Sequence, residues 1–466
     1  MVSEHASPLA VLGGVDAGGQ NMHVASLARA LVARGHDVQV FTRRDDRGLP
    51  ETVTVQPGLR VTHVPAGPAV ALGKDELAPY MPAFGRWLGR RWSTVERPDV
   101  VHAHFWMSGL ASMAAARPLG LPVVQTFHAL GTVKLRHQGS ADTSPAERIP
   151  AERRLAREVD LVLATCTDEV AELAALGAPT GRVRIVPCGV DTTLFRTRGP
   201  AAPRGDRFRL LTVGRLVERK GVATVLRALA ELVPALDAEL VIVGGPGSAG
   251  LATDPEVQRL TALAARLGIA DRIRFTGRLP APQVAAHHRA ADVVVATPWY
   301  EPFGLVPLEA MACGRPFVGS AVGGLLDTVR DGENGLLVPP RDPTALVAAL
   351  RLMAADPALR ARLGAAARRR SLRYDTARVA ADTEAAYDGV VLRASGDAVR
   401  APGSRPDPGG VRPGLGRRVV AGDVPFDTVQ GPFDTVQGPF DAVDGAGSGH
   451  DLDAAVPVPR GQRETA

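Results

Sequence analysis

The sequence predicts an α/β protein with two similar domains, each built on a parallel, doubly wound sheet. Short apolar runs typical of buried strands alternate with amphipathic helical segments, which is the pattern of such sheets. After a polar break at residues 191–205, rich in Thr, Arg, Pro and Gly, the same alternation begins again. We interpret the break as an interdomain hinge, so the two domains are expected to face each other across a cleft.

The expected elements follow in chain order. The first domain opens with a predicted strand at 9–12, a helix at 21–34 and a strand at 38–42. Its further strands are predicted at 100–103, 123–127, 161–164 and 183–186. Strands of the second domain are predicted at 208–213, 240–243, 273–275, 293–296 and 317–318.

These elements place the first domain at residues 1–197, the second at 198–369 and a C-terminal helical segment at 370–394. The tail at 395–466 is rich in Pro, Gly, Asp and Arg, and it contains a heptad that starts at Pro425, Pro432 and, altered, Pro439. Such a composition cannot bury a core, so we expect a disordered tail and assign it no role.

Composition narrows the function classes. A chain of 466 residues with 45% hydrophobic content can build two sizeable domains, and it has no long uncharged apolar run that would span a membrane. Residues 1–10 lack the features of an export signal, so a cytoplasmic location is expected. The three cysteines are scattered without metal-ligand spacing and are expected to line the core. The net charge of +5 comes without a basic stripe interleaved with aromatics, which favours an anionic small substrate over nucleic acid.

Residues 301–309 carry the clearest functional signal. A predicted strand runs into a loop that holds Glu301, and Gly304 frees the backbone where the next helix opens. The N–H groups at such a helix start favour a phosphate. Glu309 lies about one and a half turns into a helix that is nearly apolar all round, so its charge needs a partner. Carboxylates accept hydrogen bonds from sugar or ribose hydroxyls, and together these features point to a sugar nucleotide.

The basic residues provide a second signal. Only three of the 54 Lys plus Arg residues are lysines: Lys74, Lys134 and Lys220. A lysine is a compact, flexible point charge that suits close approach to phosphate oxygens. Lys220 follows the strand at 208–213 in a turn that also contains Arg215, and the two side chains could clamp a diphosphate.

Histidines and glycines near strand ends are further candidates. His128 ends a predicted strand, and parallel sheets present their chemistry at carboxyl ends. His102, on the same strand as His104, is expected to be a packed core residue. The loop at residues 13–20 contains Gly18 and Gly19, whose backbone amides could approach a negative group, although the loop lacks the dinucleotide-binding fingerprint.

These motifs resemble those of retaining family-four glycosyltransferases. Glu301 and Glu309 match their signature of two glutamates separated by seven residues, and residues 213–221 resemble their phosphate-clamp turn. The resemblance extends from residue 9 to about 392 and implies the GT-B fold, with a terminal helix that crosses back onto the first domain. It implies transfer of a hexosyl group from a nucleotide-diphosphate sugar, expected to be UDP-linked, to a small hydroxyl acceptor.

The resemblance also implies a role for each matching residue. Residues implied to bind the donor are Gly18, Gly19, Arg215, Lys220, Phe303, Gly304, Leu305 and Glu309. Within this set, Arg215 and Lys220 would hold the diphosphate and Glu309 the ribose. Glu301 and His128 would act at the transferred sugar as catalytic residues. No metal and no cofactor are implied, and the leaving phosphate oxygen would take the proton of the acceptor.

Two branches of the family compete for the acceptor. Motifs around Gln20, His104 and His128 look like sucrose-phosphate synthases, whereas residues around Lys74 and Asp142 resemble the inositol-phosphate N-acetylglucosaminyltransferases of mycothiol assembly. Both take phosphorylated acceptors. The residues expected to bind the acceptor are Gln20, Lys74, Lys134 and Arg148. Phe105 and Ala129 stand where the inositol-phosphate branch would have Tyr and Thr, which favours a different acceptor.

Two other classes of function stay open at this point. A non-hydrolysing nucleotide-sugar epimerase shares the architecture but would need no acceptor, and a non-catalytic sugar-nucleotide binding protein would show no transfer. A peripheral membrane enzyme is a third alternative, because Arg368, Arg369, Arg370 and Arg373 cluster on one helix, although such a run is usually a solvated face.

Overall fold

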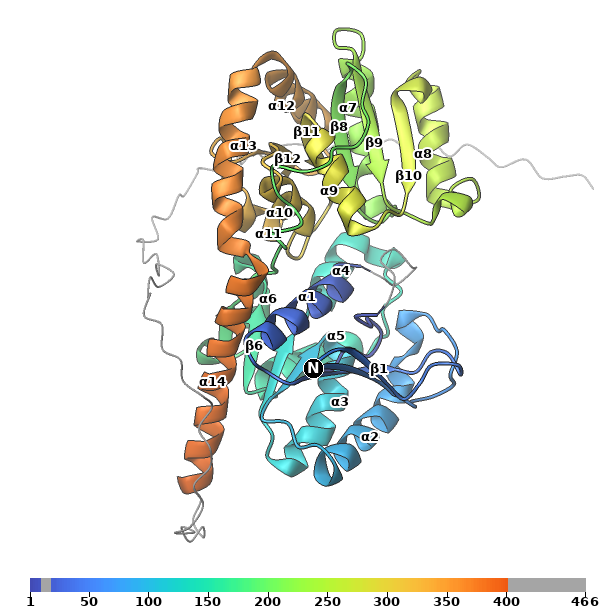
Figure 1. Cartoon of the computed structure of the whole chain (residues 1–466). Helices are drawn as coiled ribbons and strands as arrows, with labels where there is room; N and C mark the ends of the chain where they lie inside the picture. The colour runs from blue at the N-terminus through green and yellow to red at the C-terminus, as the bar shows by residue number, and fades with distance from the viewer. Residues whose placement is uncertain (10–17, 401–466) are drawn as a thin grey trace, which may run out of the picture. The chain divides into compact units, whose positions relative to one another are not determined.

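The computed structural model describes residues 1–9 and 18–400 of the chain. The strands of the first domain form a three-stranded and a four-stranded sheet that Val2 bridges, and those of the second domain form a six-stranded sheet. Layers of helices cover these sheets (Figure 1). The predicted class, α/β with two Rossmann-like domains, is therefore confirmed.

Among the residues that the structure describes, the first domain contains seven strands. They are β1 (Val38–Arg43), β2 (Thr52–Gln56), β3 (Leu59–Val64), β4 (Val101–His104), β5 (Val123–Thr126), β6 (Leu161–Ala164) and β7 (Val183–Ile185). All neighbouring pairs are parallel except the pair of β2 and β3. The helices of this domain are α1 (Gly19–Ala33), α2 (Met81–Thr94), α3 (Trp106–Ala116), α4 (Gly131–Gln138), α5 (Arg148–Glu158) and α6 (Thr167–Ala175).

The prediction of a strand at 9–12 is wrong at residue 9, the one residue of this segment that the structure describes. Leu9 lies in a turn and is 40% exposed, and residues 10–12 lie outside the described residues. The central position of the sheet is instead occupied by Val2, which bridges in parallel to Phe41 of β1 and to Ala103 of β4. Val2 is fully buried, so its backbone closes the sheet between β1 and β4 and its side chain joins the core.

The second domain contains one parallel sheet in the order β10-β9-β8-β11-β12-β13. Its strands are β8 (Phe208–Val213), β9 (Ala238–Val243), β10 (Ile273–Gly277), β11 (Val293–Ala296), β12 (Phe317–Ser320) and β13 (Leu336–Val338). Its helices are α7 (Val222–Leu232), α8 (Pro255–Arg266), α9 (Ala281–Ala290), α10 (Leu305–Ala312), α11 (Gly324–Thr328), α12 (Pro343–Ala355) and α13 (Pro357–Ser371). β8 has the predicted bounds, whereas β2, β3 and β13 were not predicted.

The cores explain why these segments form layers. Along β6, Val162 and Ala164 face one core with α2, α3 and α5, while Leu161 and Leu163 face another core with α1 and α14. Along β8, Leu210 and Leu211 likewise face opposite cores. Side chains of a strand alternate between the two faces of a sheet, so a continuous apolar run specifies a strand covered on both sides.

The C-terminal helix α14 (Thr376–Arg400) packs on α1, as the resemblance implied. It contributes to the α1 core through Val379, Ala380, Ala386, Tyr387 and Val390. The helix continues past the predicted boundary at 394, and the predicted heptads of the tail lie outside the described residues. Within the described part of the chain, no helix has the length and apolar character needed to cross a membrane.

Candidate functional site

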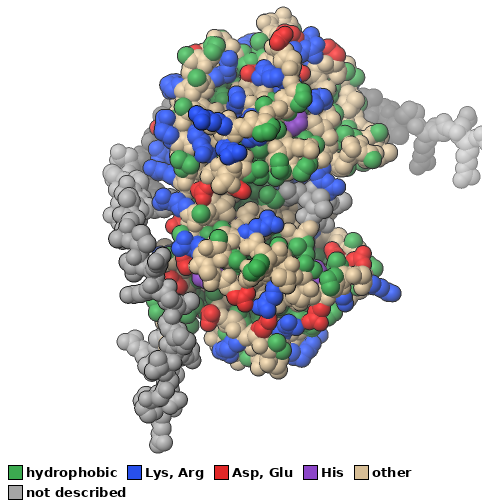
Figure 2. Space-filling model, viewed as in Figure 1, with side chains coloured by type: hydrophobic (Ala, Val, Ile, Leu, Met, Phe, Trp, Pro, Cys, Tyr) green, Lys and Arg blue, Asp and Glu red, His purple; other side chains and the backbone are tan. Residues whose placement is uncertain are grey.

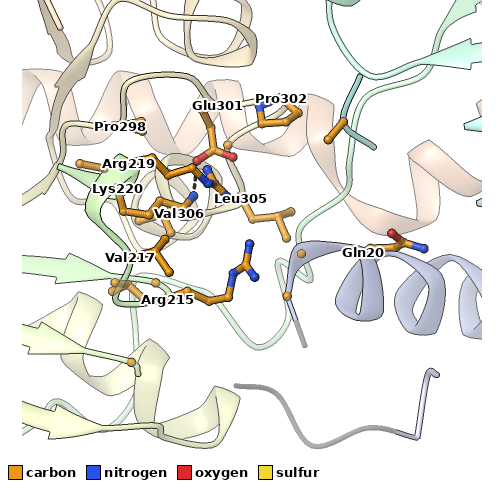
Figure 3. A pocket seen from close by; sticks show the side chains of 18 of the residues that line it. Gln20, Arg215, Val217, Arg219, Lys220, Pro298, Glu301, Pro302, Leu305 and Val306 are labelled. Carbon is orange, nitrogen blue, oxygen red and sulfur yellow. Dashed lines mark hydrogen bonds and ion pairs between the residues drawn. The ribbon is translucent and has the colours of Figure 1, made fainter. Parts of the chain in front are cut away.

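A cavity of about 760 Å³ opens at the carboxyl ends of the strands, and residues of both domains line it (Figure 3). The second domain contributes the segments that follow β8, β9 and β11. The first domain contributes the start of α1, the residue after β4 and the loop after β5. Ligands of doubly wound sheets bind at this edge because strand ends and helix starts meet there.

Lys220 and Glu301 form an ion pair at the centre of the cavity wall (Figure 3). The side chains are 23% and 15% exposed, so both charges are largely removed from water. Burial raises the pKa of Glu301, but Lys220 and Arg219 outweigh burial and bring it below its ordinary value. Burial, with the nearby Arg219 and Arg215, lowers the pKa of Lys220 by more than Glu301 raises it. Glu301 therefore stays ionised, as a hydroxyl-accepting carboxylate beside a cation.

The backbone at Gly221 positions Lys220. Gly221 has φ +73°, and a Cβ there would lie 1.9 Å from the carbonyl oxygen of Thr297. The Thr297 hydroxyl donates to the carbonyl of Gly221 over 2.8 Å, which ties the turn after β8 to the loop after β11. A side chain cannot be accommodated at this approach, and only glycine adopts the left-handed conformation without cost.

Arg215 faces the first domain. Its side chain extends toward the start of α1 (Figure 3), and a Cβ on Gly18 would lie 3.7 Å from its Nε. A Cβ on Gly19 would lie 3.2 Å from the ring of Phe303. The structure thus brings the predicted Gly18, Gly19, Arg215 and Phe303 together. The start of α1 adds the positive end of a helix dipole to the same side of the cavity.

Glu309 lies on α10, whose first turn faces the cavity. Gly304 caps this helix with φ +69°, and Leu305 is its first residue. The Glu309 carboxylate is 3.2 Å from Nε2 of His288 on α9, and its side chain is 16% exposed. His288 is thus the partner that a charge on an apolar helix was expected to need, and Glu309 still lines the cavity.

His128 follows β5 with φ +62°, a conformation rare for residues other than glycine. Its Nε2 lies 3.0 Å from Nδ1 of His104, and its ring contacts that of Phe303 edge to face. His102 is a core residue as expected, since it is buried and bonded to Thr126 and to Tyr387. Burial, assisted by neighbouring imidazoles, holds the pKa of His102, His104 and His128 well below 6.5.

The predicted acceptor residues share one wall of the cavity, but carboxylates already pair with its cations. Arg148 is 2% exposed and donates to Glu152 over 2.8 Å, while Lys134 lies 2.8 Å from Asp142. Lys74 and Arg148 both lie over the ring of Phe105, at 5.7 Å and 5.0 Å from its centroid. Lys74 also lies 4.0 Å from Asp75, so each of the three cations has a carboxylate neighbour, and their role in binding an acceptor phosphate stays a prediction. Gln20 also lines the cavity and donates to the carbonyl of His104.

Two of the four arginines that could form a membrane-facing surface make hydrogen bonds within the second domain instead. Arg370 donates to the carbonyls of Thr328 and Asp327, and Arg368 donates to the carbonyl of Ala312. In the view of Figure 2, basic side chains are spread over both domains, with a denser group on the second domain. These bonds remove two of the four arginines from the proposed basic face.

One pair that lines the cavity was not predicted. Gln138, at the end of α4, donates to the hydroxyl of Tyr300 over 2.7 Å, and Arg219 lies 4.9 Å from the Tyr300 ring centroid. This bond joins the first domain to the loop after β11. Tyr300 could have been predicted as a site residue because it precedes Glu301 in the sequence. Nothing in the sequence, however, indicates that Tyr300 bonds to Gln138.

The chain matches two family models. The model described as Glycosyltransferase Family 4 matches residues 17–194, and the one described as Glycosyl transferases group 1 matches residues 196–370. The D-inositol 3-phosphate glycosyltransferase of Acidothermus cellulolyticus is 40% identical over 391 residues, which cover 80% of this chain and 86% of that protein. The protein of the same name from Thermomonospora curvata is 38% identical, with 80% and 91% covered.

Solved structures are similar over the same region. The sucrose-phosphate synthase of Thermosynechococcus elongatus has a TM-score of 0.77 at 32% identity, covering 84% of this chain and 98% of that one. Anabaena HepE, solved with UDP-glucose, has a TM-score of 0.61 at 19% identity, with 86% and 98% covered. The latter likeness concerns the fold alone.

Proposed function

This chain belongs to the family-four glycosyltransferases of the GT-B fold, and on that premise we propose that it transfers a hexosyl group from a UDP-linked sugar, with retention, to a phosphorylated polyol or sugar. Its membership makes it a glycosyltransferase with a nucleotide-sugar donor, rather than an epimerase or a non-catalytic binding protein. The UDP moiety, the retention and the acceptor class are the proposed parts.

The observation that carries the donor site is the group of Lys220, Glu301 and Arg215 opposite Gly18 and Gly19. Two cations and a helix start converge on a space that can hold a diphosphate. In the absence of donor, Glu301 compensates Lys220. We expect Lys220 to move to the phosphate oxygens when donor binds, which frees the Glu301 carboxylate to accept hydrogen bonds from sugar hydroxyls.

The remaining donor roles follow from position. Glu309, held by His288, would accept from the ribose hydroxyls. The amides of Phe303, Gly304 and Leu305 would assist at the start of α10, and His128 would lie beside the transferred sugar. With a phosphate oxygen taking the acceptor proton, the protein mainly positions the reactants and neutralises the charge that develops on the leaving group, without a metal.

The acceptor proposal has two supports. Relatives at about 40% identity are named for inositol 3-phosphate, and a structural neighbour at 32% identity is named sucrose-phosphate synthase. In this chain Lys74, Lys134 and Arg148 line the same cavity wall, where a phosphate could exchange with Asp75, Asp142 or Glu152. Phe105 and Ala129 offer no hydroxyl there, so we propose that the acceptor differs from inositol 3-phosphate in the group beside the phosphate.

The proposal is tested by transfer assays with UDP-, GDP- and ADP-hexoses. Acceptors are inositol phosphate, fructose 6-phosphate and their unphosphorylated forms, and the anomeric configuration of the product is read by NMR. We expect transfer from a UDP-sugar, with retention and in the presence of a chelator. Inverted product, or turnover without any acceptor, would contradict the proposed reaction.

Two variants separate the donor and acceptor sites. Arg215→Ala should lower transfer to every acceptor by about 10²-fold, because it removes a cation from the developing phosphate charge. Lys74→Ala should weaken transfer only to phosphorylated acceptors. If Lys74→Ala left every phosphorylated acceptor unaffected, the acceptor proposal would fail while the donor site stood. Wild-type rates in Arg215→Ala would instead overturn the donor site.

A further inference from the structure

His288 lies on α9, beside the carboxylate of Glu309 on α10. Its side chain is fully buried, and its Nε2 is 3.2 Å from Oε2 of Glu309. The ring also contacts the ring of Phe195 edge to face, with 5.9 Å between the two centroids. The imidazole is therefore enclosed by protein, and Glu309 is the hydrogen-bond partner that the described residues give it.

The two ring nitrogens of His288 have different surroundings. A carboxylate oxygen only accepts hydrogen bonds, so Nε2 carries the proton that is shared with Glu309. Nδ1 is buried and has no partner among the described residues. A proton on Nδ1 would be a buried donor without an acceptor, which costs its full desolvation, whereas a bare lone pair there costs less. Both observations thus favour the same state, a neutral ring protonated at Nε2.

The second oxygen of Glu309 is open to the cavity. Oε1 has no hydrogen-bond partner among the described residues and is not enclosed by protein, and Glu309 lines the cavity. The carboxylate is thus held through Oε2 and unoccupied at Oε1. A carboxylate oxygen selects ligand groups that donate, such as hydroxyls. A ligand with hydrogen in place of that hydroxyl would cover Oε1 and leave it unpaired, which weakens binding.

We propose that His288 is a positioning residue that makes the cavity specific for ribonucleotides: its N–H holds one oxygen of Glu309, so that the other stays in place for a ribose hydroxyl of the bound nucleotide. Without this bond the Glu309 side chain could turn toward water whenever the hydroxyl is missing. An acceptor that is held in place discriminates more strongly, because it has no such alternative. The pairing of Glu309 with ribose rests on the proposed function, whereas the bond from His288 does not.

The specificity is measured by calorimetry on the full-length protein, as the ratio of the Kd of a deoxynucleotide to the Kd of UDP, with 2′-deoxy-UDP and 3′-deoxy-UDP as probes. The wild type should bind at least one of the two about tenfold or more weakly than UDP, because a hydrogen bond to a charged acceptor is lost. His288→Leu should reduce that ratio to about threefold or less. A wild type that does not discriminate, or an unchanged ratio in His288→Leu, would overturn the proposal.

Two further variants separate positioning from packing. Gln can place an amide N–H near the position of Nε2, so His288→Gln should keep the wild-type ratio, and equal losses in His288→Gln and His288→Leu would contradict the proposal. His287→Leu is the matched control, because His287 precedes His288 on α9 and projects about 100° away around the helix axis. It should also keep the ratio, and a loss there equal to that in His288→Leu would show a general disturbance of α9 instead.

If the wild type binds ADP or GDP in place of UDP, the UDP part of the proposed function fails, and the ratio is measured with the deoxy forms of that nucleotide. Binding of none of the three would overturn both.

A second measurement needs no ligand and no folded His288→Leu. In the full-length protein with ¹⁵N-labelled histidine, long-range ¹H–¹⁵N correlation spectra distinguish protonated from unprotonated ring nitrogens, and the signals of His288 are those missing in His288→Gln. We expect a protonated Nε2 and an unprotonated Nδ1 at pH 7.5. A proton on Nδ1 would overturn the proposal.

Discussion

At the scale of single residues, the pair of Lys220 and Glu301 is electrostatically unsymmetrical. Arg219 and Arg215 both act on it, so Glu301 is surrounded by three cations while Lys220 has one anion and two like charges. Breaking a buried pair leaves an uncompensated charge, which is costly. Removing the charge of Glu301 and removing the charge of Lys220 should therefore lower the free energy of unfolding by different amounts.

Glu301→Gln should lower the free energy of unfolding of the ligand-free protein by about 3 kcal/mol, because Lys220 would remain beside two arginines. Lys220→Met should cost less, about 1 kcal/mol, since Arg219 and Arg215 still compensate Glu301. Urea unfolding of the two variants and of the double variant measures the difference. A Lys220→Met variant that lost as much stability as Glu301→Gln would show that the arginines do not act on the pair.

At the scale of elements, α14 is the segment that ties the end of the described chain to the first domain. Its buried residues recur at helical spacing on the face toward α1, and Val390 is 2% exposed. Leu392, two positions further on, is 72% exposed. The same helix also places the Tyr387 hydroxyl 2.7 Å from Nδ1 of His102. The helix therefore contacts the buried His102 as well as the core.

Val390→Ala should lower the free energy of unfolding by about 2 kcal/mol, because it removes two buried methyl groups and leaves a small cavity. Leu392→Ala removes more atoms but should change stability by less than about 0.5 kcal/mol, since that side chain is in water. Denaturant unfolding of both variants checks the face that α14 buries. The opposite ranking would mean that the helix packs in another rotation.

At the scale of the whole molecule, the buried histidines couple folding to pH. Burial lowers the pKa of His23 to about 4, and the pKa values of His102, His104 and His128 lie well below 6.5 for the same first reason. An unfolded chain binds protons at these residues below about pH 6.5, whereas the folded protein does not. Stability is therefore complete above pH 6.5 and is lost as the pH falls through the interval down to about 4.

Each such histidine should contribute a slope of about 1.4 kcal/mol per pH unit between pH 6 and 5. His23→Leu should reduce the wild-type slope by that amount, measured by urea unfolding at several pH values. The slope of the wild type alone does not isolate the histidines, because burial raises the pKa of Glu169 and this carboxyl group changes stability with pH in the opposite direction. The difference in slope between the wild type and His23→Leu removes that contribution. Parallel pH profiles for wild type and His23→Leu would refute this coupling.

The sequence predicted elements whose signal is local. Residues 208–213 have four apolar side chains in six and form the predicted strand, and Gly304 marks a helix start because its φ of +69° favours glycine. The strand at Thr52–Gln56 was missed because its side chains are largely half-buried at a sheet edge, and Leu336–Val338 is too short to show a period. Short or edge strands depend on their neighbours for their conformation.

By itself, then, the sequence determined the two-domain α/β fold, the family and some of the residues that line the cavity, because periodicity, glycine positions and motif spacing are local properties. Only the tertiary structure decided how those residues pair. Val2 closing the first sheet, Glu301 compensating Lys220 and Asp142 compensating Lys134 are contacts between segments that no local pattern joins. Charge and burial act through space, so the electrostatic state of the site exists only once the chain is folded.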